Sequence, residues 1–189
     1  MDWNNIEKSW IEFCENHNLK LLDYEKQLFP QMDKVKEYKT VEISNKFKLY
    51  FHYKFYMGDV LQLANYFHII VPVSSKVNFR ISPNSFIKKV IKKEKLLIVS
   101  ENIPSDYFEN FHQYFSDFYK QFPDLVIRLG ELEKGNSSIE SGFGLQVITK
   151  KYLPETASGI EQFRLLVNEL LDRFQTIITP IENKEMDFN

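Results

Sequence analysis

The chain has 189 residues, of which 43% are apolar and 26% charged, and its 24 basic and 26 acidic side chains leave a formal charge of −2. These values fit one globular domain that is large enough to bury a core, and they exclude a disordered chain. The balanced charge argues against a general nucleic-acid surface, and the single cysteine excludes an internal disulfide and gives no metal-site spacing.

The first predicted element is an amphipathic helix over residues 3–17, which Asn18 is suited to end. Its apolar face, repeated at intervals of three and four residues, comprises Trp3, Ile6, Trp10, Phe13, Cys14 and His17. Residues 19–37 give no clear pattern beyond a possible short strand at 19–22. Pro30 interrupts any regular element there.

The central feature is a long β-hairpin over residues 46–71, preceded by a short strand at 39–43 and a turn at 44–45. Alternate residues of a strand point to opposite faces. In the first arm, one face comprises Phe47, Leu49, Phe51, Tyr53, Phe55 and Met57. The other face comprises Lys48, Tyr50, His52, Lys54 and Tyr56.

The loop length decides how the two arms of this hairpin align. A two-residue turn at 58–59 mixes the two faces, whereas a three-residue loop at 58–60 gives one apolar face with Asn65 as its single exception. We therefore predict the three-residue loop. It sets Tyr50 opposite His68 and His52 opposite Tyr66.

The following segments alternate between strands and helices. Alternating apolar residues predict strands at 77–81, 125–129 and 142–149, and a short apolar run predicts a buried strand at 96–99. Ser82 followed by Pro83 is typical of a helix start and predicts a helix to about residue 93. A second helix is predicted at 105–122, with phenylalanines at 108, 111, 115, 118 and 122 on one side.

The last predicted helix begins near a capping box formed by Ser158 and Glu161. Its apolar stripe comprises Ile160, Phe163, Val167, Leu170, Leu171 and Phe174. This order of elements predicts an α+β fold: a largely antiparallel sheet around the 46–71 hairpin, with about four amphipathic helices mainly on one face. A parallel crossover within 77–129 is an open alternative. We assign one domain to 1–179 and a polar, frayed tail to 180–189.

The polar face of the hairpin is the best candidate for a working surface. It gathers aromatic rings with polar edges, a side-chain type suited to protein contact. The partner-binding candidates are Tyr50, His52, Lys54, Tyr56, Tyr66 and His68. The alternatives are an ordinary solvated or helix-covered face and, less favoured, a surface that stacks nucleic-acid bases.

Neither catalysis nor metal binding is predicted for His52 and His68. In the predicted register the two imidazoles lie two pairs apart, and no Asp or Glu of the hairpin lies on their face. A general base usually needs an orienting carboxylate, and a metal needs at least one more ligand. We therefore expect no catalytic residue, no metal site and no cofactor.

A basic cluster in the predicted helix 83–93 is the second candidate surface. Lys88 and Lys92, and likewise Lys89 and Lys93, stack at a spacing of four residues. A solvated helix face explains them best, and an anionic partner is the alternative. Cys14 lies on an apolar stripe, which indicates a buried hydrophobe and not a nucleophile.

These patterns favour a non-enzymatic protein that acts through protein–protein contact or homodimerisation. The alternative is a small-molecule-binding protein or enzyme with a pocket between helix 105–122 and the sheet, where Tyr107, Tyr114 and Tyr119 could line a cleft. No run approaches the ~18 apolar residues of a membrane span. No secretory signal is visible, so we expect a cytoplasmic protein without membrane contact.

Overall fold

The computed structural model describes residues 3–27, 34–57, 65–83, 96–103, 105–108, 116–132 and 142–181. Its helices are α1 (Trp3–Asn16), α4 (Ser116–Gln121) and α5 (Ala157–Arg173), with a 3-10 turn, η1, at Ser105–Phe108. Its strands are β1 (Leu22–Gln27), β2 (Lys34–Ser44), β3 (Phe47–Met57), β4 (Tyr66–Ser74), β5 (Asn78–Pro83), β6 (Leu96–Glu101), β7 (Val126–Glu131), β8 (Phe143–Thr149) and β9 (Thr179–Pro180).

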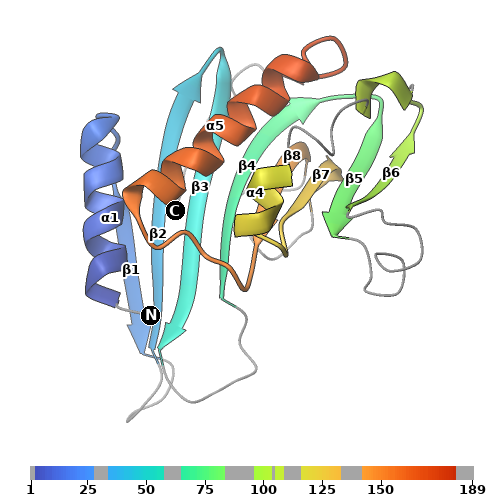
Figure 1. The fold of residues 1–189 in the computed structure, drawn as a ribbon. Helices are drawn as coiled ribbons and strands as arrows, with labels where there is room; N and C mark the ends of the chain where they lie inside the picture. Colours follow the sequence, from blue (N-terminus) through green and yellow to red (C-terminus); the bar gives the residue numbers. More distant parts are fainter. Residues whose placement is uncertain are drawn as a thin grey trace.

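One antiparallel sheet organises the molecule. Its strand order is β1-β2-β3-β4-β8-β7-β5-β6, so β1 and β6 form its two edges, and β9 adds a short pairing to the end of β4. Helices α1, α4 and α5 lie on the same side of this sheet (Figure 1). The predicted α+β fold with a largely antiparallel sheet is confirmed. Every pairing between the described strands is antiparallel, so the alternative of a parallel crossover in 77–129 finds no support there.

The described residues contain three α-helices, not the four expected. Segment 105–122 begins as the 3-10 turn η1 and ends as the short α4, and 109–115 lie outside the described residues.

Ser82 and Pro83 do not start a helix. They belong to β5, where they pair with Leu97 and Leu96 of β6. Proline is tolerated at this strand end because no inner ladder bond there needs its missing N–H. The remainder of the predicted helix 83–93 falls outside the described residues.

The two faces of the sheet differ in what covers them. We call the helix face the one that carries Leu49, Phe51, Tyr53 and Phe55 of β3, because the described helices pack on it. The second face carries Tyr50, His52, Lys54 and Tyr56 of β3 and the residues in register with them. Within the described part of the chain, no helix packs on the second face. Faces were therefore assigned correctly from the alternation in β3.

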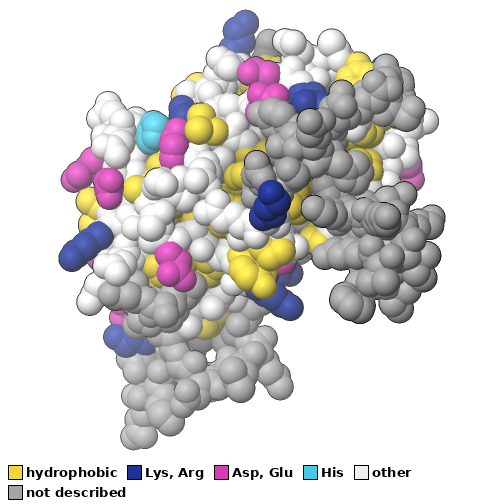
Figure 2. Space-filling view, viewed as in Figure 1, with side chains coloured by type: hydrophobic (Ala, Val, Ile, Leu, Met, Phe, Trp, Pro, Cys, Tyr) yellow, Lys and Arg dark blue, Asp and Glu magenta, His cyan; other side chains and the backbone are white. Residues whose placement is uncertain are grey.

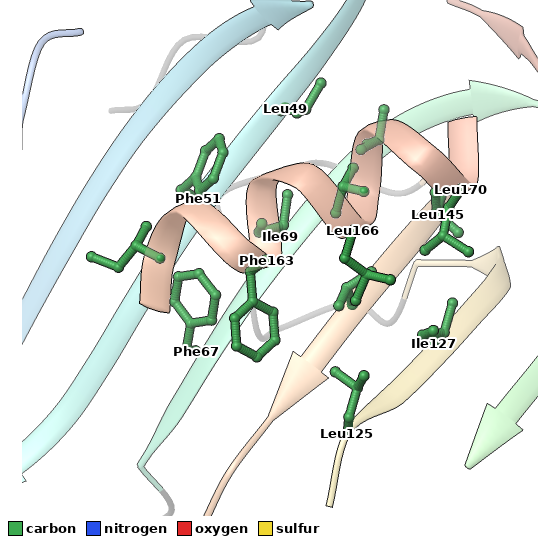
Figure 3. Close-up of a cluster of buried hydrophobic side chains, with 14 of the residues drawn as sticks. Leu49, Phe51, Phe67, Ile69, Leu125, Ile127, Leu145, Phe163, Leu166 and Leu170 are labelled. Atoms are coloured by element: carbon green, nitrogen blue, oxygen red, sulfur yellow. The ribbon is translucent and has the colours of Figure 1, made fainter. Parts of the chain in front are cut away.

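The core lies between α5 and the helix face (Figure 3). Phe163 projects from α5 and contacts the ring of Phe67 at 4.9 Å and that of Phe122 at 4.5 Å, measured between ring centroids. All six residues of the stripe predicted for this helix are buried. Since each buried side chain of this size contributes ~1.5–3 kcal/mol, this layer is a large part of what stabilises the fold.

Helix α1 covers the other half of the helix face, as its two-sided pattern predicts. Trp10 and Phe13 are fully buried, and the Trp10 ring stacks on Tyr38 of β2 with a centroid distance of 6.0 Å. Asn18 ends the helix with a φ of 51°, and Leu19 N–H donates to the Cys14 carbonyl at 2.8 Å. Asparagine tolerates this left-handed backbone conformation, which explains the stop.

The start of α5 differs from the prediction. The cap is Thr156, whose extended backbone lets its hydroxyl accept from Gly159 N–H at 3.0 Å, so the predicted Ser158 cap is wrong by two residues. Threonine, like serine, is a favoured N-cap residue because its hydroxyl accepts from an N–H group of the first helical turn. Arg164 then ties this helix to β2 through a bidentate pair with Glu42, at 2.6 and 2.7 Å.

The strands around the central hairpin are longer than predicted. Strand β2 runs over eleven residues and joins β3 through a two-residue turn in which Asn45 and Lys46 both have positive φ, 48° and 74°. That turn geometry matches the right-handed twist of paired strands. The prediction began this strand at 39, and its omitted part, 34–38, carries a residue that proves central to the second face.

The side of the molecule that bears the helices is chemically mixed. Acidic, basic and apolar side chains alternate over it in small groups (Figure 2). At the C-terminal end, Thr179 and Pro180 pair with Ser74 and Val73, and residues 182–189 lie outside the described part of the chain.

Candidate functional site

The register between β3 and β4 brings two histidines together. His52 pairs directly with His68, Tyr50 with Ile70 and Lys54 with Tyr66. The predicted three-residue loop is therefore wrong, because the pairing is displaced by two residues from the one that such a loop would set. A displacement of two residues keeps every side chain on its face but changes each cross-strand partner. Residues 58–64 lie outside the described part of the chain.

The imidazoles and one tyrosine form a compact ring cluster on the second face. The His52 and His68 centroids lie 5.0 Å apart in an edge-to-face arrangement of 74°. Tyr66 stacks on His68 with a centroid distance of 5.0 Å and an interplanar angle of 26°, and it meets His52 edge-on at 5.2 Å. The separation of two pairs expected between the histidines is thus contradicted.

A carboxylate from β2 completes this cluster. Glu37 is in register with Lys54, and its Oε2 lies 3.0 Å from His52 Nε2. Lys54 Nζ contacts the other carboxylate oxygen at 2.9 Å, and Lys39 Nζ contacts Oε2 at 3.0 Å. The sequence-based expectation concerned carboxylates of the hairpin only. The carboxylate on this face comes from the neighbouring strand β2. We call Glu37, Lys39, His52, Lys54, Tyr66 and His68 the second-face cluster.

The charges of this cluster follow from its contacts. The hydrogen bond from His52, together with Lys54 and Lys39, holds the pKa of Glu37 far below its usual range despite partial burial. Burial lowers the pKa of His52, and the Glu37 carboxylate only partly opposes that effect. Near neutral pH, Glu37 is therefore ionised and His52 is neutral, donating its Nε2–H to the carboxylate.

His68 is the more strongly perturbed imidazole. Burial lowers its pKa well below the ordinary value, and its electrostatic interactions with neighbouring His52 and Lys39 act in the same direction. Burial also raises the pKa of the Tyr66 hydroxyl, with the Glu37 charge adding to it. Both groups are thus neutral in the folded protein near pH 7.

The predicted contact residues divide into buried and accessible ones. Tyr50, His52 and His68 expose only 4–6% of their surface. Tyr50 packs with Ile70 and with Leu132. A Cβ at position 144 would lie 3.0 Å from a methyl group of Leu132, which favours glycine there. Lys54, Tyr56 and Tyr66 are half-buried. A partner could touch the latter three, whereas the buried three set the shape and charge of the surface from beneath.

Accessible apolar side chains lie at both margins of the second face. Tyr24 and Ile43 are exposed at the β1–β2 margin, where Ile43 reaches 73% exposure. Leu97 and Val99 of β6 are exposed at the opposite margin, and Val99 reaches 54%. The strand predicted at 96–99 is therefore present, but it is an edge strand and not a buried one.

The described cavity lies away from both the cluster and α4. Its volume is about 370 Å³, and Asn78, Arg80, Arg128 and Glu101 are among its lining residues. Arg80 and Arg128 come from directly paired positions of β5 and β7. In the next strand, buried Gln146 is in register with Arg128, and its Nε2 has no hydrogen-bond partner among the described residues.

The described parts of segment 105–122 pack against the core. Phe118 and Phe122 contact Phe163, and the Tyr107 hydroxyl lies 2.8 Å from that of Thr176. Tyr119 is buried. The described side chains of this segment therefore contact α5 and the residues that follow it, and the pocket predicted between helix 105–122 and the sheet stays a prediction. Tyr114 lies outside the described residues.

The remaining candidate residues can be placed in part. Cys14 is buried, as expected, and burial raises the pKa of its thiol. Lys88, Lys89, Lys92 and Lys93 lie outside the described part of the chain. The described residues hold no group of three or more His, Cys, Asp or Glu side chains arranged for a metal ion. Nor do they include a helix with the length and apolar character needed to traverse a bilayer.

Comparison of the chain with protein-family models, with curated proteins and with solved structures finds no match. The second-face cluster and the exposed margins are therefore the features from which function must be argued.

Proposed function

We propose that this protein is a non-enzymatic, cytoplasmic interaction module that contacts a protein partner through the second face of its sheet. One observation carries this proposal. Half of the large apolar side chains exposed among the described residues lie on that face, namely Tyr24, Ile43, Leu97 and Val99. Apolar groups that remain in water on a face without a described helix favour burial by a partner.

The polar centre between those margins supports the same role. The Glu37 carboxylate is held by three donors from β2 and β3, which fixes the lysine and imidazole side chains around it. A preorganised surface loses little side-chain entropy on binding. The half-buried Tyr56 and Tyr66 then offer apolar rings with polar hydroxyls at small entropic cost. Lys54 lies 5.6 Å from the Tyr56 ring centroid, which restricts both side chains further.

The test uses a photo-crosslinking amino acid placed at position 43 in cells. The matched control carries the same group at position 165, because Leu165 is also an exposed aliphatic residue, at 55%, but lies on α5. We expect a discrete crosslinked protein from position 43 and not from position 165. Lys54→Glu should weaken that crosslink, because it reverses a charge on the same face. Equal products from both positions, or none from position 43, would contradict the proposal.

A second candidate function is the binding of a small anionic molecule in the described cavity. Arg80 and Arg128 both line this cavity, and guanidinium groups are suited to bind carboxylates and phosphates. Glu101 also lines it, which limits its preference for anions. A thermal-shift screen with small carboxylates and phosphates, repeated with Arg80→Ala, tests this candidate. A stabilising compound that loses its effect in the variant supports it.

A further inference from the structure

Strand β6 forms one edge of the sheet in the described part of the chain. It is last in the strand order, and no described strand pairs with its outer side. Leu97, Val99, Ser100 and Glu101 are exposed, and Ile98 is half-buried. The strand carries no charge before Glu101 at its end. An exposed edge of this composition offers its backbone N–H and C=O groups to another strand.

The other edge strand, β1, has the opposite character. Its six residues include Asp23, Glu25 and Lys26, and Glu25 forms a 2.7 Å ion pair with Lys34 of β2. Charged side chains along an edge oppose strand addition, since a partner strand would have to desolvate them. Among the described residues, one edge strand of the sheet thus carries charges that oppose strand addition, whereas the other edge strand is mainly apolar.

We propose that β6 pairs antiparallel with β6 of a second copy, forming a twofold-symmetric dimer with a continuous sheet. The proposal rests on the proposed function, because it names the partner at one margin of the second face. In an antiparallel pair, directly opposed side chains lie on the same face. A continuous sheet with matched faces therefore requires a twofold axis centred on a residue and not between residues.

A twofold axis centred on Ile98 gives the most complementary pairing of side chains between the two β6 strands. Leu97 of each copy then lies opposite Val99 of the other, so both exposed apolar side chains of the edge find apolar partners. Centring on Val99 instead sets Leu97 against Glu101. Centring on Leu97 carries the partner of Val99 beyond the start of β6 at Leu96. Self-complementarity about Ile98 thus favours a second copy over an unrelated strand.

The geometry of this dimer has two consequences. The twofold axis runs perpendicular to the sheet, so the second faces of both copies join into one surface and the helices remain on the other side. Pairing of six-residue strands buries less area than a standard interface, so the dimer should be weak and concentration-dependent. An asymmetric pairing of β6 with β1 would instead build open filaments, and the charges of β1 oppose it.

The decisive experiment compares two double variants by sedimentation equilibrium over a concentration series. In Leu97→Lys/Val99→Lys, each introduced ammonium group would face another across the axis. In Leu97→Lys/Val99→Glu, each ammonium would face a carboxylate. Both variants lose the same apolar side chains from the same exposed positions. We expect the dissociation constant of the like-charged variant to exceed that of the opposite-charged variant by at least about tenfold.

Circular dichroism and thermal melts of both variants control for folding. Tyr24→Lys, which adds a charge to the β1 edge, should leave the dimer unchanged. A native chain that stays monomeric at the highest attainable concentration would overturn the proposal, and so would equal dimerisation of the two double variants. Crosslinking from position 43 is read independently, so failure of the β6 dimer and failure of the second-face function are distinguishable.

Discussion

The two faces of the sheet are stabilised by different kinds of interaction. Residues that alternate along β3 place Phe51, Tyr53 and Phe55 under the helices, and His52 and Lys54 on the second face. The helix face is stabilised by apolar burial between layers. The second face is stabilised by an ion-paired carboxylate and stacked rings that come from three neighbouring strands. Hence one strand contributes to a core and to a polar surface, and the two should respond differently to substitution, pH and salt.

The largest expected effect is on the helix face. Phe163→Ala removes a fully buried ring that contacts Phe67, Phe118 and Phe122. Loss of the transferred area plus the remaining cavity should lower the free energy of unfolding by about 3–5 kcal/mol. Urea denaturation measures this change. Leu165→Ala, two residues away on the exposed side of α5, is the control and should cost less than about 0.5 kcal/mol.

A smaller loss is expected from the second face. Glu37→Gln keeps the shape of the side chain but removes the charge that Lys39, Lys54 and His52 contact. Leaving those partly buried donors with a weaker acceptor should lower the free energy of unfolding by about 1–3 kcal/mol. Glu25→Gln breaks an exposed ion pair and should cause no measurable change in urea denaturation. A cost for Glu37→Gln equal to that of Phe163→Ala would remove the distinction between the faces.

The pH dependence of stability should come from the second face. Burial lowers the pKa of His52 and His68, so as pH falls below 6.5 the unfolded chain takes up protons before the folded protein does. Stability therefore falls with falling pH, and each imidazole contributes a slope of up to about 1.4 kcal/mol per pH unit. The low pKa of Glu37 adds a further loss at more acidic pH.

Denaturation of native protein and of His68→Leu, each from pH 7.5 to 5, checks this prediction. The titratable groups that His68 faces are those of His52, Lys39, Glu37 and Tyr66. The variant should show a shallower slope, whatever its stability at pH 7.5. Parallel slopes for the two proteins would mean that His68 is not held neutral by the fold.

Local sequence patterns predicted the direction of side chains within a strand better than they predicted which residues of neighbouring strands pair. The alternation in 47–57 assigned both faces of β3 correctly, because side-chain direction in a strand depends only on sequence parity. The hairpin register depended on loop length, and the preference for a short loop set it wrong by two residues. Glu37 was missed because segment 34–38 was not assigned to a strand, although Val35, Glu37 and Lys39 alternate with Lys36 and Tyr38. No local signal shows that β2 lies beside β3 in the register that brings Glu37 to His52.

The smallest expected effect concerns a single atom of the helix face, the hydroxyl oxygen of Tyr53. The Tyr53 hydroxyl lies on the helix face, is buried and has no hydrogen-bond partner among the described residues, whereas the polar atoms of Glu37 are paired. A buried hydroxyl without a partner carries an uncompensated desolvation cost. Tyr53→Phe should therefore raise the free energy of unfolding by about 0.5–1 kcal/mol, measured by urea denaturation. The control is Tyr24→Phe, which removes a hydroxyl from a side chain exposed on the second face and should leave stability unchanged. Destabilisation by Tyr53→Phe would mean that this hydroxyl makes a stabilising polar contact in addition to the Arg164–Glu42 pair on the same face, and the helix face would then depend less on apolar burial alone.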